Sequence, residues 1–268
     1  MKEKRIVMVD LDGVVLNSKY QTTKNIQQVA GMLGSTSYIV PNSDTPVERL
    51  AMFFRQSIGV DSDIIIGENG AVVKHFGEMH CTHLGINTRK CIQNIKSAFT
   101  ECDCTILECD APILVRGKQV LAPNTKFILI DKFRRMSVSM FFLITDRYGI
   151  LRINQKWSDI CLRKLEACNK PNSLSEFVYN PKYGIAISSV EAVSKTFGYL
   201  FLRQKYPDAQ FFMIGDSNAD IIEDEEVIHL SVNNASRSLK SRAKFVASCE
   251  YTAGLEQCFE WVLKEYVY

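Results

Sequence analysis

The alternation of short apolar runs with amphipathic stretches constrains the fold of this 268-residue chain more than any other feature. Residues 5–9 (RIVMV) form an apolar, β-branched run that predicts a buried parallel strand. Helical spacing follows over residues 22–33 and ends at Gly34, and a second short strand is expected at 38–40. Strand, helix and strand joined by short links are typical of a doubly wound α/β sheet.

The same rhythm continues along both ends of the chain. Thr45-Pro46-Val47-Glu48 predicts a helix with Thr45 at its N-cap, Pro46 in its first turn and a C-terminus near residue 57. Residues 64–66 predict a third strand. Near the C-terminus the expected order is helix 190–203, strand 211–214, helix 219–225, strand 227–232, and helices 236–242 and 252–262. Both ends of the chain are therefore expected to build one doubly wound, mostly parallel Rossmann-like sheet.

The middle of the chain has a different pattern, in which strands outnumber helices. Helices are expected at about 87–99 and 154–168. The strand-like runs are 71–76, 105–108, 126–131 and 137–145. This composition of elements indicates an α+β domain inserted into the α/β domain. We expect a core domain of residues 1–78 and 189–268, and an inserted domain of residues 79–188.

Composition and charge exclude several classes of protein. Hydrophobic residues make up 46% of the chain and charged residues 23%, which excludes a disordered or fibrous protein. A net charge of +2 gives no reason to expect a nucleic-acid partner. Because no apolar run approaches about 20 residues, no membrane helix is expected. The N-terminus lacks a signal peptide, and nine cysteines without framework spacing indicate reduced thiols, so we expect a cytoplasmic protein.

The strongest chemical signal is Asp10-Leu11-Asp12-Gly13, directly after the first predicted strand. Carboxylates at the carboxyl end of a parallel strand lie where α/β sheets bind ligands. Gly13 permits the sharp turn that lets backbone amides face a ligand. The alternative is that this segment is only a turn sequence.

A second acidic segment, Ile214-Gly215-Asp216-Ser217-Asn218-Ala219-Asp220, follows another apolar strand. By itself, Asp216 would be interpreted as a helix N-cap and Asp220 as an acid in the first helical turn. Together with Asp10 and Asp12, the two residues predict four carboxylates at one edge of the sheet. Such a cluster requires a divalent cation, and oxygen ligands favour Mg²⁺.

The order and spacing of these motifs resemble the haloacid dehalogenase (HAD) superfamily, specifically the Cof-type branch with a C2 cap. The resemblance covers nearly the whole chain. The matching positions are Asp10 and Asp12 in the first motif, Ser43 in the second, Lys195 in the third, Gly215, Asp216 and Asp220 in the fourth, Glu68-Asn69-Gly70 at the entry to the cap, and Val232-Asn233-Asn234-Ala235 after the last motif.

The resemblance implies a role for each of these positions. Asp10 would be the nucleophile that forms an aspartyl phosphate, and Asp12 would be the general acid and base. The resemblance assigns phosphate binding to Ser43, Asp44 and Lys195, and Mg²⁺ binding to Asp10, Asp12, Asp216 and Asp220. Asn69, Asn218 and Lys182 are weaker candidates for positioning a substrate.

The chain departs from the pattern of this branch in three of the motifs. The fourth motif has Ala219 where Asn is usual, Thr45 and Asp44 replace the usual Arg and Gly of the second motif, and Val14 replaces a commoner Thr. The resemblance implies a Mg²⁺-dependent phosphatase acting on a small phosphorylated metabolite, with a sugar phosphate expected. The alternatives are a phosphohexomutase of the phosphomannomutase type, suggested by Ser43-Asp44, and a binding protein that has lost catalysis. The sequence names neither the metabolite nor the oligomeric state.

Two further groups have simpler explanations. His75, His80, Cys81 and His83 lie within nine residues but lack a familiar zinc spacing, so we expect a polar strand-to-helix connection. Cys102, Cys104 and Cys109 are expected to be small buried hydrophobic residues. The basic residues of the predicted insert are candidates for substrate recognition, with Lys182 beside Tyr183 preferred over Arg116, Lys118, Lys132, Arg134 and Arg135.

Overall fold

The computed structural model describes residues 5–81, 88–117, 120–166, 177–189 and 193–265. The chain divides into two compact units. Unit 1 comprises residues 1–82 and 193–268, and unit 2 comprises residues 83–192. The sequence placed the corresponding boundaries at 78/79 and 188/189.

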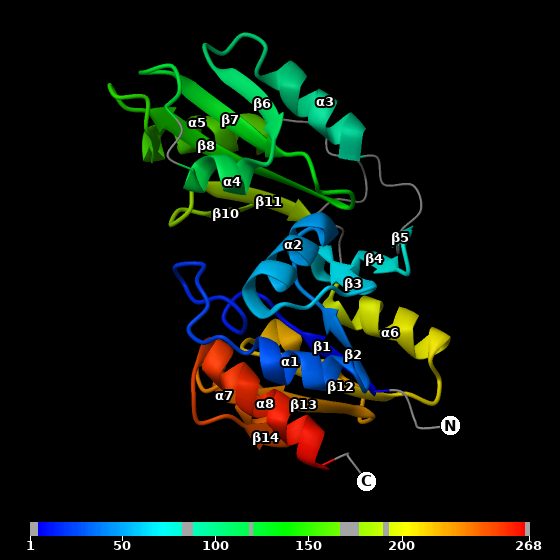
Figure 1. Ribbon diagram of the computed structural model, residues 1–268. Coiled ribbons are helices and arrows are strands. Elements are labelled where there is room, and N and C mark those ends of the chain that lie inside the picture. The colour runs from blue at the N-terminus through cyan, green and yellow to red at the C-terminus, as the bar shows by residue number, and fades with distance from the viewer. Residues whose placement is uncertain (1–4, 82–87, 118–119, 167–176, 190–192, 266–268) are drawn as a thin grey trace. The chain divides into compact units, whose positions relative to one another are not determined.

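A five-stranded sheet with strand order β14-β13-β12-β1-β2 forms the centre of unit 1, and every pairing within it is parallel (Figure 1). Its strands are β1 (Arg5–Val9), β2 (Ser37–Pro41), β12 (Gln210–Gly215), β13 (Val227–Ser231) and β14 (Phe245–Val246). Its helices are α1 (Gln27–Gly34), α2 (Val47–Ile58), α6 (Lys195–Lys205), α7 (Arg237–Arg242) and α8 (Tyr251–Glu265). The expected doubly wound α/β fold is confirmed.

The core of unit 1 lies on both faces of this sheet. Ile6 and Met8 of β1 pack in one cluster with Tyr199 and Leu202 of α6. Successive side chains of a strand point to opposite faces, so residues 7 and 9 point away from this cluster, and they are equally buried. Both faces of the sheet are therefore covered, which explains why β1 is an uninterrupted apolar run rather than an alternating one.

A second, smaller sheet follows α2 in unit 1. It contains β3 (Ile64–Gly67), β4 (Val72–His75) and β5 (Glu78–Cys81), which pair antiparallel. A short 3₁₀ turn, η1 (Glu68–Gly70), joins β3 to β4. The strand predicted at 64–66 exists, but it belongs to this antiparallel sheet, and a single parallel bridge from Asn42 to Ile66 connects it to the end of β2.

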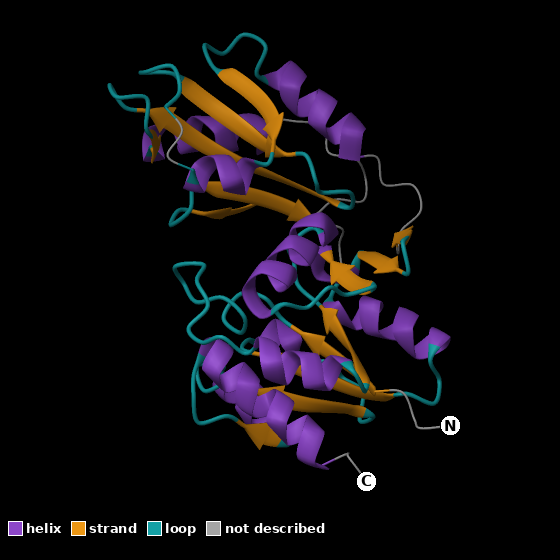
Figure 2. Ribbon diagram, viewed as in Figure 1, coloured by secondary structure: helices purple, strands orange, loops and turns teal. Residues whose placement is uncertain are grey.

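Unit 2 is an α+β unit with a six-stranded sheet, ordered β10-β11-β8-β7-β6 with β9 also pairing with β8 (Figure 2). Only β6 and β7 pair in parallel. The strands are β6 (Thr105–Cys109), β7 (Lys126–Asp131), β8 (Ser137–Thr145), β9 (Leu151–Ile153), β10 (Val178–Asn180) and β11 (Ile185–Ser189). The helices are α3 (Thr88–Ala98), α4 (Ala111–Arg116) and α5 (Gln155–Glu166). In unit 2 the sequence did not predict α4, β9, β10 or β11, and in unit 1 it did not predict β5 or β14; most of these elements are short.

Four helix predictions were wrong in extent or existence. The helix predicted at 22–33 begins only at Gln27. Of the helix predicted at 190–203, residues 190–192 lie outside the described residues, residues 193–194 are not helical, and α6 runs from Lys195 to Lys205. Pro46, not Thr45, is the N-cap of α2. No helix occupies residues 219–225, where a single 3₁₀ turn, η2 (Asn218–Asp220), precedes an extended stretch.

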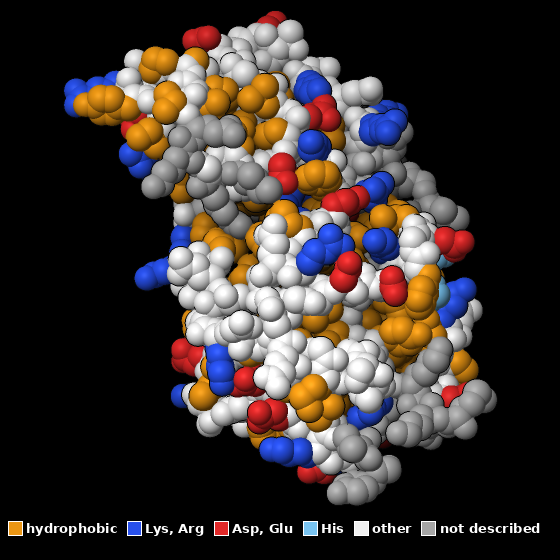
Figure 3. All heavy atoms as spheres, viewed as in Figure 1, with side chains coloured by type: hydrophobic (Ala, Val, Ile, Leu, Met, Phe, Trp, Pro, Cys, Tyr) orange, Lys and Arg blue, Asp and Glu red, His pale blue; other side chains and the backbone are white. Residues whose placement is uncertain are grey.

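The surface shows no concentration of one charge on the face seen in Figure 3, where basic and acidic side chains are interspersed. Within the described residues, none of the helices is both long enough and apolar enough to cross a membrane.

Candidate active site

The parallel pairing of β1 with β12 brings two of the predicted carboxylates to one edge of the sheet. Val9 and Ile214 are paired residues near the ends of these strands, and Asp10 follows the first strand as Asp216 follows the second. The backbone N–H of Asp10 donates to the carbonyl of Ile214 at 3.0 Å, which extends the ladder by one bond. The carboxyl ends of the two strands therefore set the positions of both acids.

Asp220 is held by the loop in which it lies. Its Oδ2 accepts hydrogen bonds from the backbone N–H groups of Asp216 at 3.0 Å and Ser217 at 2.9 Å, and from Ser217 Oγ at 3.0 Å. Ser217, rather than Asp216, is the N-cap of the 3₁₀ turn, and it forms a capping box with Asp220. The Asp220 side chain is fully buried, and this loop fixes its orientation.

Lys195 connects two of the acids. It is the first residue of α6 and is 4% exposed. Its Nζ donates to Asp10 Oδ1 and to Asp220 Oδ1, each at 2.5 Å. The structure therefore brings together Asp10, Asp216, Asp220 and Lys195, which come from three separate parts of the sequence.

This cluster contains more acidic than basic side chains, and burial raises the pKa values of two of the acids. Burial raises the pKa of Asp10 well above its ordinary value, and although Lys195 opposes this shift, the nearby Asp220 adds to it. Burial and the charge of Asp220 raise the pKa of Asp216 to about 6. Burial alone would lower the pKa of Lys195, but the two carboxylates outweigh it and the net pKa is raised. The charge of one ammonium group therefore does not offset the effect of burial on Asp10 and Asp216.

The same three acids could hold a metal ion. One carboxylate oxygen from each of Asp10, Asp216 and Asp220 can be chosen so that all lie within 4.8 Å of one another. Oxygen ligands of this kind suit a hard divalent cation such as Mg²⁺, and a cation would supply the missing positive charge. The donor set therefore fits the metal that the sequence motifs imply.

The loop that follows β1 approaches Asp216 closely. Gly13 has a φ of +85°, and a Cβ added there would lie 2.0 Å from Asp216 Oδ2. Asn234 Nδ2 donates to the Gly13 carbonyl at 2.8 Å, and Asn234 Oδ1 accepts from the N–H of Tyr251 at 3.0 Å. Asn234 thus ties the first motif to the start of α8. The sequence indicates Asn234 only as one position of a motif, and this tie could not be predicted from it.

The second motif lies at the end of β2. Ser43 is 2% exposed, its N–H donates to the carbonyl of Ile66 at 3.1 Å, and its carbonyl accepts from Asn69 N–H at 3.1 Å. The Ser43 Oγ accepts from the N–H of Thr45 at 3.2 Å, so the hydroxyl organises its own loop. Asp44 is half-buried and Asp12 is exposed. Asp12 is not among the three acids that could share a metal ion, and its acid-base and metal-binding roles remain predictions, as do the phosphate-binding roles of Ser43 and Asp44.

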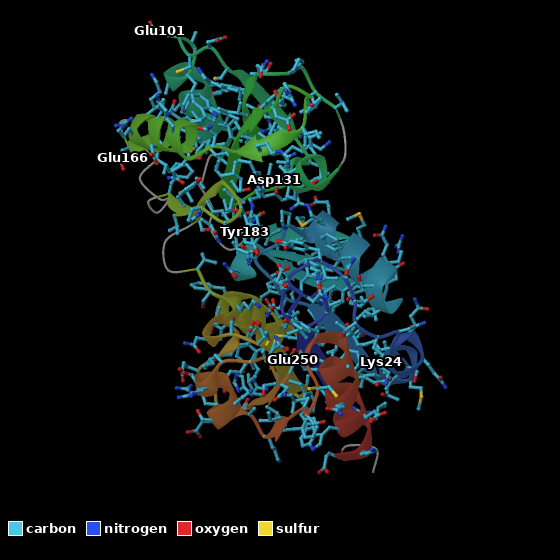
Figure 4. All side chains as sticks on the ribbon, turned by 90° about the vertical axis from the view of Figure 1, so that its left-hand side faces the viewer. Lys24, Glu101, Asp131, Glu166, Tyr183 and Glu250 are labelled. Atoms are coloured by element: carbon cyan, nitrogen blue, oxygen red, sulfur yellow. The ribbon has the colours of Figure 1, made fainter. Side chains whose placement is uncertain are left out.

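The weaker candidates have other contacts. Asn218 Oδ1 accepts from Ser236 Oγ at 2.7 Å. Lys182 is an exposed residue of unit 2, in the turn between β10 and β11, and its Nζ lies 5.1 Å from the ring centroid of Tyr183, which is labelled in Figure 4. A substrate-positioning role for Lys182, Asn69 or Asn218 stays a prediction.

The histidine-rich segment forms a strand pair rather than the predicted connection to a helix. His75 ends β4, and its Nε2 is hydrogen-bonded to Tyr206 Oη at 2.9 Å. His80 in β5 packs on Phe201 with ring centroids 4.8 Å apart. His83 and Lys118 lie outside the described residues. In the part of the chain that is described, the three carboxylates are the only group of three or more potential metal ligands that meets.

Comparison with known proteins shows which solved structures share the fold of this chain. No protein-family model matches the sequence, and no curated protein does so either. Solved structures match over nearly the whole chain. A haloacid dehalogenase-like hydrolase from Bacteroides thetaiotaomicron has a TM-score of 0.63 at 12% identity, covering 97% of this chain and 100% of its own. A HAD/COF-like hydrolase from Plasmodium vivax has a TM-score of 0.62 at 13% identity, covering 98% and 97%.

A third match comes from work on the phosphatases of the HAD superfamily. It is also from Bacteroides thetaiotaomicron and has a TM-score of 0.57 at 16% identity, covering 99% of this chain and 96% of its own. The resemblance expected from the motifs is therefore confirmed at the level of structure. The chain has the complete fold of the HAD-like and Cof-like hydrolases, with the three gathered acids at the carboxyl ends of its parallel strands.

Proposed function

We propose that the protein is a Mg²⁺-dependent phosphomonoesterase that hydrolyses a small soluble metabolite, a sugar phosphate, through an aspartyl-phosphate intermediate. The observation that carries the proposal is the contact of Lys195 with both Asp10 and Asp220, next to Asp216, at the carboxyl edge of the sheet. The hydrolase and phosphatase names of the structural matches support the same reaction class. The free thiols of the described cysteines fit the cytoplasmic location that we also propose.

The first half-reaction uses Asp10 as the nucleophile. Lys195 holds Oδ1 of Asp10, so Oδ2 would attack phosphorus. The new bond joins Asp10 to phosphorus, and the bond from phosphorus to the ester oxygen breaks. Asp12, which is exposed, would give its proton to the leaving oxygen.

The second half-reaction reverses these roles. A water molecule attacks phosphorus, Asp12 takes its proton, and the bond to Asp10 breaks to release inorganic phosphate. Lys195 and Ser43 would bind the phosphoryl oxygens and offset the charge that develops on them. A Mg²⁺ ion held by Asp10, Asp216 and Asp220 would act as a Lewis acid that neutralises this charge.

A phosphohexomutase remains the second candidate because Ser43 is followed by Asp44 instead of glycine. Such an enzyme would also form an aspartyl phosphate but would return the phosphoryl group to the sugar. It should therefore depend on a bisphosphate activator and release little free phosphate. A protein that has lost catalysis would have no need for two buried carboxylates on one buried lysine with a third, half-buried acid beside them, so we place that hypothesis last.

The test is release of phosphate from p-nitrophenyl phosphate, with and without Mg²⁺, by the native protein and by Asp10→Asn. Asparagine keeps the shape of the side chain but removes its nucleophilic charge, so we expect turnover to fall about 10³-fold or more. Asp61→Asn is the matched control, because Asp61 is exposed and pairs with Arg55.

Each outcome has a distinct meaning. Mg²⁺-dependent turnover that is lost in Asp10→Asn and kept in Asp61→Asn supports the proposal. If native protein with Mg²⁺ releases no phosphate from either p-nitrophenyl phosphate or a panel of sugar phosphates, hydrolysis is wrong. An isomerisation assay supplied with a hexose bisphosphate would then identify a mutase.

A further inference from the structure

The residues that follow the acidic loop are held by individual hydrogen bonds, since no helix forms there. The N–H of Ile222 donates to His229 Nε2 at 3.1 Å, and Ile222 is 1% exposed. The N–H of Asp224 donates to the carbonyl of Ile222 at 2.9 Å, and that of Val227 donates to the carbonyl of Asp224 at 3.1 Å. Residues 221–224 run directly on from Asp220, so their position bears on where its carboxylate lies.

Helix α6 holds this segment at two points. Lys195 Nζ donates to Asp220 Oδ1 at 2.5 Å, and Tyr199 Oη donates to Asp224 Oδ2 at 2.6 Å. Lys195 and Tyr199 are four residues apart and lie on the same face of the helix. Asp220 and Asp224 are also four residues apart. The two contacts therefore close a ring between one turn of α6 and the segment that leaves the acidic loop.

The Tyr199 side chain is a rigid anchor for this contact. It is fully buried, and its ring packs edge-on against Phe211 with centroids 5.1 Å apart. Burial and the bond to Asp224 raise the pKa of Tyr199, so its hydroxyl stays protonated and donates. The same bond, together with the N–H of Glu226 at 2.9 Å from Asp224 Oδ1, lowers the pKa of Asp224. A charged acceptor makes this a strong hydrogen bond.

We propose that Tyr199 and Asp224 are positioning residues of the active site, whose hydrogen bond holds residues 221–224 so that Asp220 stays against Lys195 and the acidic loop. The inference deepens the proposed function and rests on it for the link to catalysis. Residues that orient metal ligands without touching the metal commonly change metal affinity or activity about 10- to 100-fold when replaced. The expected effect lies at the lower end of this range, because the bond acts through four residues of backbone.

The test compares Tyr199→Phe with Tyr206→Phe. Both changes remove one hydroxyl at α6, but Tyr206 contacts His75, away from the acidic loop. In Tyr199→Phe we expect the Mg²⁺ concentration for the half-maximal rise in melting temperature to increase about tenfold. We expect kcat to fall by a similar factor with KM unchanged. Tyr206→Phe should leave both quantities at their native values.

A second readout needs neither metal nor substrate. The N–H groups of Asp216 and Ser217 donate to Asp220 Oδ2, so their ¹H–¹⁵N chemical shifts report on the position of that carboxylate. These two resonances should move in Tyr199→Phe and in Asp224→Asn, but not in Tyr206→Phe. The double variant Tyr199→Phe with Asp224→Asn should show little more change than either single variant.

The outcomes separate this inference from the proposed function. Equal Mg²⁺ midpoints and unmoved amide resonances in Tyr199→Phe would overturn the positioning role, even if the melting temperature falls. A native protein that releases no phosphate, but whose Asp216 and Ser217 resonances move in Tyr199→Phe, would contradict the proposed function and leave the positioning of Asp220 supported.

Discussion

Each unit of the molecule contains a buried acid beside a buried base, but the two groups differ in their balance of charge. In unit 2, Arg134 Nε lies 3.8 Å from Asp131 Oδ2, and the two side chains are 7% and 1% exposed (Asp131 is labelled in Figure 4). Arg134 also donates to Ser137 Oγ and Ser139 Oγ, each at 3.0 Å. In this ion pair, the positive charge of Arg134 faces the negative charge of Asp131. The other hydrogen bonds of the guanidinium go to neutral hydroxyl groups.

The group in unit 1 has three acids around a single lysine. A buried ion pair that is balanced and fully hydrogen-bonded needs nothing more, whereas an excess of buried charge needs a further partner. A surplus of one charge, rather than burial of charge as such, therefore distinguishes the candidate active site from a structural ion pair.

Replacing the base should change the response to Mg²⁺ in unit 1 but not in unit 2. In Lys195→Met, kcat/KM should fall about 10²- to 10³-fold, because the phosphoryl oxygens lose their cationic partner. Without Mg²⁺, both Lys195→Met and Arg134→Met should lose about 3–5 kcal/mol of unfolding free energy, because each leaves buried carboxylate uncompensated. Mg²⁺ should then raise the melting temperature of Lys195→Met by more than it raises that of the native protein.

The control for this prediction is the response of Arg134→Met to the same metal. Its melting temperature should rise with Mg²⁺ by the same amount as that of the native protein. If Mg²⁺ raises the melting temperature of the native protein, Lys195→Met and Arg134→Met by the same amount, the acids of unit 1 do not bind the cation.

Stability should also depend on pH through the acids of unit 1. The pKa of Asp216 is raised to about 6 and that of Asp10 is also raised well above its ordinary value by burial, so both folded-state values exceed those of the unfolded chain. A raised pKa contributes stability that is present below about pH 4 and is lost as the pH rises through the folded value. In EDTA, the melting temperature should therefore fall as the pH rises through about 6.

Melting curves from about pH 4.5 to 7.5, with EDTA or with Mg²⁺, check this prediction. Because protons compete with the cation, the Mg²⁺-induced rise should be small below about pH 5 and should grow through about pH 6. Asp216→Asn should flatten the fall in EDTA. A Mg²⁺ effect of constant size over this range would contradict the assignment of the raised pKa to the metal site.

The smallest expected effect comes from one hydroxyl in each unit. Ser217→Ala removes a donor to Asp220, and Ser139→Ala removes an acceptor from Arg134. Each should cost about 1 kcal/mol of unfolding free energy in denaturant titrations. Only Ser217→Ala should raise the Mg²⁺ midpoint, by about twofold, since a change of about 0.4 kcal/mol in ligand orientation has that effect. A shift in the midpoint of Ser139→Ala would remove the contrast between the units.

Much of the fold and the centre of the site follow from the sequence, because apolar runs locate the buried strands and the residues after them lie at their carboxyl ends. Asp10, Asp216 and Asp220 could be predicted on this basis. The helix at 219–225 could not be excluded, since Ile221 and Ile222 followed by acids fit helical spacing. Hydrogen bonds to residues outside the predicted helix decide the outcome there, above all the one from the N–H of Ile222 to His229 at the next strand.

The same limit applies to the residues that support the site. The bond between Tyr199 and Asp224 joins residues 25 positions apart, and neither lies in a motif. The role of Lys195 followed only from the resemblance, because an isolated lysine at a helix start is ordinarily exposed. Short strands such as β9 and β10 carry too few residues for a period to be recognised.

The close approach of Gly13 to Asp216 has a consequence for how the sequence of this protein can change over time. Any side chain at position 13 would both occupy the space of Asp216 Oδ2 and adopt a φ that strongly favours glycine. Gly31 in α1, by contrast, has no atom beyond its chain neighbours and its own helix backbone within 4 Å of the point that a Cβ would occupy, so a methyl group fits there. In a library of random variants selected for function, every selected variant should keep glycine at position 13, whereas position 31 should accept other residues.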